Sequence, residues 1–189
     1  MKEVFALTAA ALALIGYIPY LRDTWRRNIE PHAYTWFVWS LVSAITLSGQ
    51  LIKGAGIGAL PTALSLGFSL LIFVLALRSG MKHVTRLDTA FLFAALLGLI
   101  PWILTKDPTT SVLVAVAIDL VAFVPTIRKA WRKPLSEAPH LYAINVLRHI
   151  LSLFALEAYN LATASHSVAM VIANSVMTVL VMRSRRNGQ

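Results

Sequence analysis

Residues 17–27 of the chain read YIPYLRDTWRR, and residues 123–133 read FVPTIRKAWRK. Aligned residue for residue, the two segments share an aromatic residue, a proline, an aliphatic residue, an arginine, a tryptophan and a final basic pair, in the same order. A single shared proline or tryptophan could arise by chance, but an ordered set of this kind hardly would. The pattern therefore predicts an internal repeat, which determines the architecture of the whole chain.

The similarity continues on the carboxyl side of both segments. The chain reads Glu-Pro-His-Ala-Tyr over 30–34 and Glu-Ala-Pro-His-Leu-Tyr over 137–142, then Leu-Arg-Ser over 77–79 and Met-Arg-Ser over 182–184. We therefore expect two repeats of three helices each, joined by one linking helix. The predicted domains are the first repeat at 1–79, the linker at 80–108 and the second repeat at 109–189.

Seven apolar runs account for most of the chain, and each is close to the ~20 residues that a helix needs to cross a ~30 Å hydrocarbon layer. We expect helices throughout, because an isolated strand cannot satisfy its backbone hydrogen bonds in lipid. The predicted fold class is an all-α membrane protein with seven transmembrane helices in two parallel three-helix repeats. The predicted spans are Val4–Leu21, His32–Ile52, Ile57–Leu77, Leu87–Leu104, Ser111–Ile127, Ala138–Ala158 and Ser165–Met182.

Composition supports a lipid environment. Hydrophobic residues make up 58% of the 189 residues and charged residues only 13%, whereas a soluble domain carries about 25% charged residues. So much apolar surface cannot be buried in one small core, and the lipid bilayer is the expected partner for the remainder. The chain has no cysteine, which excludes disulfides, thiolate metal sites and cysteine nucleophiles.

The basic residues indicate orientation rather than nucleic-acid binding. Although the net charge is +9, Lys and Arg lie almost entirely in short segments between the apolar runs, and on one side of the membrane. The positive-inside rule then places the amino terminus outside and the carboxyl terminus in the cytoplasm, in the cell (inner) membrane. The cytoplasmic set is Arg22, Arg26, Arg27, Arg78, Lys82, Arg86, Arg128, Lys129, Arg132, Lys133, Arg183, Arg185 and Arg186, against Lys2, Lys53 and Lys106 outside.

This plan of three, one and three helices resembles the PQ-loop/SWEET superfamily of transporters. Each repeat has a proline near the cytoplasmic end of its first helix and a basic loop behind it, and the family's Pro-Gln stands here as Pro19-Tyr20 and Pro125-Thr126. The resemblance implies alternating access, with Pro19 and Pro125 as hinges, and a homo-oligomer. Two prolines that merely fit the helix packing are the alternative reading.

Two ionisable residues fall inside predicted spans, where charge is costly. Asp119 lies about nine residues from the basic loop at Arg128, and Arg148 lies at a similar depth in the sixth span. We expect the two to pair, either as a structural salt bridge or as a site for substrate or protons. His149, beside Arg148, and Glu157, nearer the outer end, are further candidates for proton coupling.

The sixth span carries the most polar stripe, and a helix facing lipid all round would not carry one. Its members are Asn145, Arg148, His149, Ser152, Tyr159 and Asn160. The stripe predicts either a hydrophilic pathway between the repeats or a set of interhelical hydrogen bonds.

Further residues are expected to face a pocket for a small solute. On the second span, Ser40 stands at the position of Arg148 in the repeat, and Trp39 lies deeper than Trp36, which we assign to the membrane interface. Ser69 and Asn174 correspond to one another in the third and seventh spans. The resemblance implies that Trp39 and Asn174 face the central cavity. The predicted substrate-binding set is Trp39, Ser40, Ser69, Asn145, Arg148 and Asn174.

The sequence thus favours a transporter of a small polar solute, such as a sugar, an amino acid or a vitamin-like compound, with or without proton coupling. A receptor-like or a purely structural membrane protein on the same fold is the alternative. No paired carboxylates or nucleophile–base set converge, so we expect no enzyme activity, and neither a metal nor a cofactor is predicted. Nucleic acid is not an expected partner.

Overall fold

The computed structural model describes most of the chain and is helical throughout that part, with no strand in it. The described residues are 1–27, 31, 33–79, 86–97, 100, 104, 107–132 and 139–187. The α-helices are α1 (Lys2–Trp25), α2 (Ala33–Ile52), α3 (Leu60–Ala76), α4 (Arg86–Leu97), α6 (Pro108–Arg132), α7 (Pro139–Ala155) and α8 (Leu161–Asn187). Two 3₁₀ helices, η1 (Gly56–Ala59) and η2 (Leu77–Ser79), flank α3.

Three of the described helices are long and apolar enough to cross a membrane, which agrees with the predicted class. They cover Lys2–Trp25, Gly56–Ala76 and Leu161–Arg183. Shorter apolar helices cover Trp36–Ile52, Pro108–Val121 and Tyr142–Ala155. The fourth predicted span is described only in part, because α4 ends at Leu97 and much of 98–104 lies outside the described residues.

Side-chain caps explain where two of the long helices begin. Asp107 precedes α6, and its carboxylate accepts hydrogen bonds from the backbone amides of Thr109 (3.1 Å) and Thr110 (3.2 Å). Asn160 precedes α8 in the same way, with its side-chain oxygen accepting from the amides of Ala162 (3.1 Å) and Thr163 (3.2 Å). Such caps satisfy amides that have no partner within the helix.

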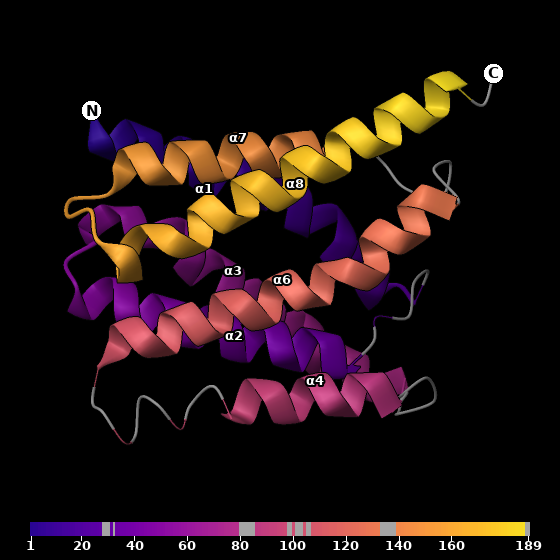
Figure 1. The fold of residues 1–189 in the computed structure, drawn as a ribbon, viewed down its shortest axis with the longest axis horizontal. Helices are drawn as coiled ribbons and strands as arrows, with labels where there is room; N and C mark the ends of the chain where they lie inside the picture. Colours follow the sequence, from indigo (N-terminus) through magenta and orange to yellow (C-terminus); the bar gives the residue numbers. More distant parts are fainter. Residues whose placement is uncertain are drawn as a thin grey trace.

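The helices lie side by side in alternating directions (Figure 1). Helices α1, α3, α6 and α8 run toward the end that holds the carboxyl terminus, and α2, α4 and α7 run back. The first helix of each predicted repeat, α1 or α6, therefore points the same way.

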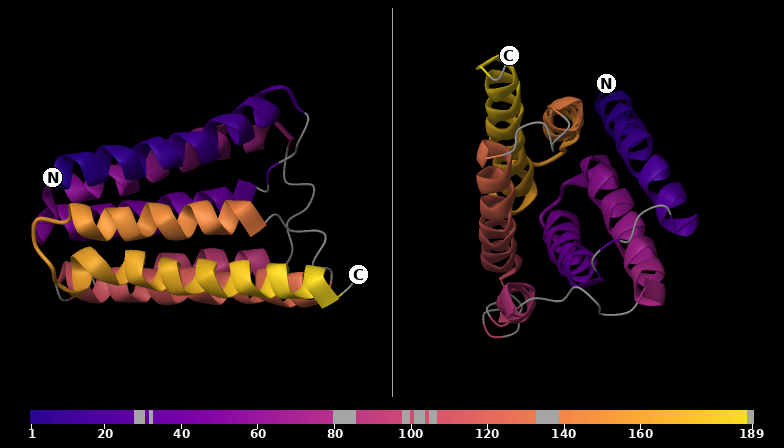
Figure 2. Two further views of the ribbon diagram at one scale, coloured as in Figure 1. Left: turned by 90° about the horizontal axis from the view of Figure 1, so that it is seen from above. Right: turned by 90° about the vertical axis from the view of Figure 1, so that its right-hand side faces the viewer.

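The contacts between helices close into a ring, visible end on in Figure 2. Its order is α1, α3, α2, α6, α8, α7 and back to α1, while α4 packs outside the ring against α2 and α6. Within each half the third helix lies between the other two. Exchanging α1 with α6, α2 with α7 and α3 with α8 turns the α1–α7 contact into the α6–α2 contact, so the ring has the pattern of a two-fold repeat.

Helices α2 and α6 approach closely because a glycine faces a valine. A Cβ atom added at Gly49 would collide with a methyl group of Val112, which is fully buried. Apolar residues from both helices extend the same seam toward the other end of the bundle: Val38, Val42, Ile45, Ala115 and Ile118. Small residues at such positions let two helix backbones pack tightly.

One end of the bundle is closed by η1 and the turn that follows α7. Ala55, Ala59 and Leu156 form a buried apolar cluster there, and a Cβ atom at Gly58 would lie 2.8 Å from the backbone of Leu156. The amide of Glu157 donates to the carbonyl of Ala55 (3.1 Å). At the opposite end, α1 and α3 diverge from α6 and α8 (Figure 2).

Candidate functional site

A cavity of about 460 Å³ lies inside the ring of helices. Helices α1, α2 and α3 of the first half line it together with α6, α7 and α8 of the second, while α4 contributes nothing. Its size is that of a pocket for a small molecule.

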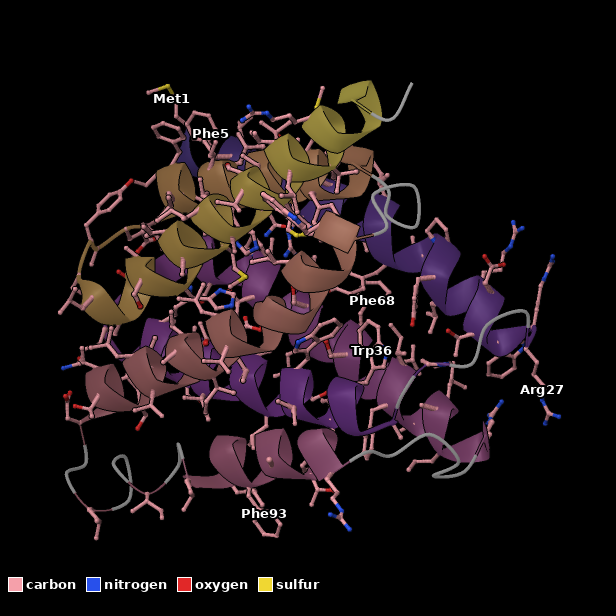
Figure 3. The ribbon with its side chains drawn as sticks, turned by 45° about the vertical axis from the view of Figure 1, so that its right-hand side comes forward. Met1, Phe5, Arg27, Trp36, Phe68 and Phe93 are labelled. Carbon is pink, nitrogen blue, oxygen red and sulfur yellow. The ribbon has the colours of Figure 1, made fainter. Side chains whose placement is uncertain are left out.

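Aromatic side chains from the first half form one wall. The ring of Trp36 lies 5.1 Å from that of Tyr20 and 5.0 Å from that of Trp39, centroid to centroid, and Tyr17 stacks on Phe68 at 5.1 Å. Trp36 on α2 and Phe68 on α3 both contact the ring of Tyr17, and Figure 3 labels the two residues. The assignment of Trp36 to the membrane interface is wrong: its side chain is only 6% exposed and lines the cavity, because the aromatic rings of α1 cover it.

Arg148 is the centre of the opposite, polar wall. One terminal nitrogen donates to the hydroxyl of Ser65 (2.9 Å), and the other lies 2.9 Å from Nε2 of His149. An arginine only donates hydrogen bonds, so Nε2 of His149 must accept, and the proton on that ring belongs on Nδ1, which lies 3.4 Å from Ser167 Oγ. The Nε group of Arg148 is buried with no partner among the described residues.

Asp119 pairs with a residue that the sequence analysis did not single out. Its Oδ2 lies 3.2 Å from Nε2 of His166 on α8. The predicted Asp119–Arg148 pair is wrong, since no described carboxylate makes an ion pair with Arg148. Asp119 and Arg148 both line the cavity, as their similar depth along α6 and α7 predicts. Depth does not give the direction of a side chain around its helix axis, and the carboxylate of Asp119 contacts His166 instead.

These contacts join four helices into one polar chain. It runs from Ser65 on α3 through Arg148 and His149 on α7 to His166 and Asp119 on α8 and α6. The two imidazole rings meet edge to face, with centroids 5.6 Å apart. The chain therefore connects the two halves of the molecule at the cavity wall.

The structure places most of the predicted substrate-binding residues around the cavity. Trp39, Ser69, Asn145, Arg148 and Asn174 line it, as do Asp119 and His149. Asn174 is only 3% exposed, and its amide nitrogen donates to the carbonyl of Met170 (2.8 Å) within α8.

Ser40 and Glu157 lie elsewhere. The hydroxyl of Ser40 is buried and donates to the carbonyl of Trp36 (2.7 Å), so it is used within α2. Glu157 lies in the exposed turn after α7, where its carboxylate accepts from the amide of Ile57 (3.4 Å). The predicted sixth span continued to Ala158, whereas α7 ends at Ala155, so Tyr159 and Asn160 are not on the polar stripe of that helix.

Both hinge prolines are inside helices. Pro19 falls within α1, six residues before its end at Trp25, and α6 continues through Pro125 to Arg132. Neither helix is broken there, and the hinge role remains a prediction.

Among the polar and aromatic residues of the cavity, sequence reasoning did not single out Tyr17, Tyr20, Ser65 and His166. His166 stands eight positions before Asn174, hence on a similar face of one helix, and this spacing was a usable signal. It was overlooked because His166 falls at the first turn of the predicted seventh span. Serine and tyrosine are common in membrane helices, so residue type alone could not identify Ser65, Tyr17 and Tyr20 as cavity residues.

No cluster of metal-binding side chains occurs among the described residues. No family model, no curated protein and no solved structure matches this chain. The function is therefore argued from the geometry of the cavity.

Proposed function

We propose that this protein is a membrane carrier for a small polar solute, which binds in the cavity between two three-helix units. The observation that carries the proposal is the position of the cavity: all six helices of the ring, three from each half, line it with both aromatic and polar side chains. Carriers built from repeats bind their substrate at the interface of the repeats, near mid-membrane.

In this proposal the chain crosses the membrane seven times, with α4 linking the two parallel repeats. The matched contacts α1–α7 and α2–α6 favour a two-fold relation between the repeats. The orientation has the amino terminus outside, because the basic residues gather at the carboxyl-terminal ends of α1, α3, α6 and α8 and in the segments that follow these ends. In Figure 3, Met1 and Arg27 lie toward opposite ends of α1.

The two ends of the cavity suggest how access alternates. At the outer end, η1 seals against the turn after α7 through Gly58 and Leu156, and Asn160 donates to the carbonyl of Lys53 (3.0 Å). At the cytoplasmic end the helices of the two halves diverge (Figure 2). In this proposal the outer end is the closed one, and rocking of the halves would open η1 while closing the other end.

Asp119 and His166 are the pair best placed for proton coupling. They lie on α6 and α8, line the cavity together, and bring a carboxylate and an imidazole, two groups that can each bind a proton, to within 3.2 Å. His149 is less suited than predicted, because it accepts a hydrogen bond from Arg148 and would lose it on protonation.

The test is binding followed by flux. Purified protein is screened by thermal shift against sugars, amino acids, nucleosides and vitamin precursors, since a ligand at a hundredfold excess over its Kd stabilises by about 2.7 kcal/mol. Each hit is then assayed for uptake into proteoliposomes. Arg148→Ala and Asn174→Ala should abolish uptake and leave a monodisperse protein, whereas Glu3→Gln, at the exposed start of α1 and outside the cavity, should leave uptake unchanged.

The main rival is a structural protein whose polar residues only hold helices together. The hydrogen bond from Gln50 on α2 to the carbonyl of Thr163 on α8 (3.2 Å) is of that kind. If Arg148→Ala and Asn174→Ala both lower the unfolding temperature and no solute binds, the structural role is favoured. Binding without uptake would favour a receptor.

A further inference from the structure

Arg148 is a buried cation that has no counter-ion among the described residues. Its side chain is 9% exposed, and its two hydrogen-bonding partners, the Ser65 hydroxyl and Nε2 of His149, are both neutral acceptors. A guanidinium has five N–H donors, so these two contacts leave three unused, among them the buried Nε group. A charge held in this way is costly unless something neutralises it.

The carboxylate of Asp119, which lines the same cavity, does not neutralise Arg148. Its Oδ2 is taken by His166 at 3.2 Å, and no described carboxylate oxygen pairs with Arg148. Arg148 is also the only Lys or Arg among the described residues that line the cavity. Arg148 thus holds one positive charge that no described carboxylate pairs with, enough for a single negative charge on a ligand.

The opposite wall defines the rest of the ligand. Tyr17, Tyr20, Trp36 and Trp39 present ring faces and edges to the same cavity. Such surfaces favour a flat or apolar group and offer little to a fully hydroxylated one.

We infer that the solute is a monocarboxylate with a small flat apolar group, whose carboxylate bridges the free N–H donors of Arg148 while the apolar group packs on the aromatic wall. A carboxylate fits the planar fork of a guanidinium through two parallel hydrogen bonds. The inference names the substrate class for the carrier proposed above and so rests on that proposal. Sugars, neutral nucleosides and cationic amino acids are thereby excluded as main substrates.

The test uses pairs of probes that differ only in charge. Phenylacetate is compared with phenylacetamide, and indole-3-acetate with indole-3-acetamide, by calorimetric titration of the purified protein at neutral pH; acetate serves as the acid without a ring. We expect each aromatic acid to bind at least about tenfold more tightly than its amide, and more tightly than acetate. Amides that bind as well as the acids, or no saturable binding of either acid, would overturn the inference.

Variants at Arg148 assign the preference to that residue. Arg148→Gln should bring the acid and amide affinities to within about twofold of each other, and a preference that persists in this variant refutes the assignment. If Arg148→Gln does not fold, Arg148→Lys replaces it. Lysine keeps the charge but loses the planar fork, so the acids should bind more weakly than to the parent yet still ahead of the amides; equal affinities would count against the inference.

Transport is assayed separately, so that the two proposals can fail independently. Proteoliposomes loaded with unlabelled indole-3-acetate are tested for counterflow of the labelled acid. Tight binding of the acid without counterflow upholds the anion site and overturns the carrier. Uptake of a neutral solute without any preference for acids does the opposite.

Discussion

The imidazole of His166 on α8 lies with its Nε2 atom 3.2 Å from Oδ2 of Asp119 on α6, at the wall of the central cavity. The other ring nitrogen of His166 is buried without a partner in the described part of the chain. One polar contact thus links α6 to α8 at the wall of the cavity. This arrangement connects proton binding to the geometry of the cavity.

Asp119→Asn is expected to remove the response of transport to a pH gradient. The asparagine amide carries no negative charge and cannot take up a proton. A proton bound by His166 would then have no carboxylate beside it to neutralise. Uptake into proteoliposomes should become insensitive to an imposed gradient, while exchange at equal pH on both sides continues. Glu3→Gln, which changes an exposed carboxylate outside the cavity, is the matched control and should keep the gradient response. A gradient response that survives in Asp119→Asn would refute proton coupling at this pair.

Gly49→Ala should destabilise the seam between α2 and α6. The added methyl group meets a methyl group of Val112, and overpacking of this kind costs about 1–3 kcal/mol. Thermal unfolding in mild detergent measures the loss. Gly67→Ala on α3 is the control: nothing lies within 4 Å of its Cβ position, so the change should be neutral or stabilising by up to about 1 kcal/mol.

The same seam allows a double-variant test. Val112→Ala removes the methyl group that Gly49→Ala would meet, so the double variant should be more stable than the sum of the two single changes. Strict additivity would mean that the two side chains do not touch, and the close packing of α2 on α6 would be wrong.

Asp107 should give the protein an acid-sensitive helix cap. The amide of Thr109 and the hydroxyl of Thr110 donate to its carboxylate, and they lower the pKa of Asp107 below its ordinary value of 3.8. Because the folded-state pKa is the lower one, the stabilisation is complete above the ordinary value and is lost as the pH falls through the folded-state pKa.

The difference between parent and variants isolates this cap from other carboxylates. Asp107→Ala should unfold at a lower temperature than the parent at neutral pH, and the gap should shrink below about pH 3.8. Asp107→Asn keeps a capping oxygen, so it should resemble the parent at neutral pH and lack the acid-dependent part. A gap between parent and Asp107→Ala that is constant with pH would contradict the assignment.

Single cysteines can establish the orientation, because the chain has none of its own. Arg26→Cys replaces an exposed residue just after α1, and Lys53→Cys replaces one just after α2. Because α1 and α2 run in opposite directions, the two positions lie at opposite ends of the bundle (Figure 1). With the amino terminus outside, a membrane-impermeant maleimide should label Lys53→Cys on intact cells and Arg26→Cys only after permeabilisation. The reverse pattern would overturn the proposed topology.

The sequence alone determined the class of the protein and most residues of the candidate site. Apolar length and scarce charge require helices in lipid, and these are properties of composition that tertiary contacts do not alter. Polar residues inside apolar runs were recognisable for the same reason: burying them in a membrane needs a compensating partner. Arg148 and Asp119 were found on this ground, Asn174 was found from its match to Ser69 in the repeat and from the family resemblance, and all three line the cavity.

The partners of these residues were decided only by the tertiary structure. Sequence gives the depth of a side chain along its helix, at 1.5 Å per residue, but not the rotation of one helix against another. That rotation directs Asp119 to His166 rather than to Arg148, and it buries Trp36 beneath Tyr20 instead of leaving it at the interface. It also leaves Arg148 without a counter-ion among the described residues, and the proposed substrate class follows from that single consequence of packing.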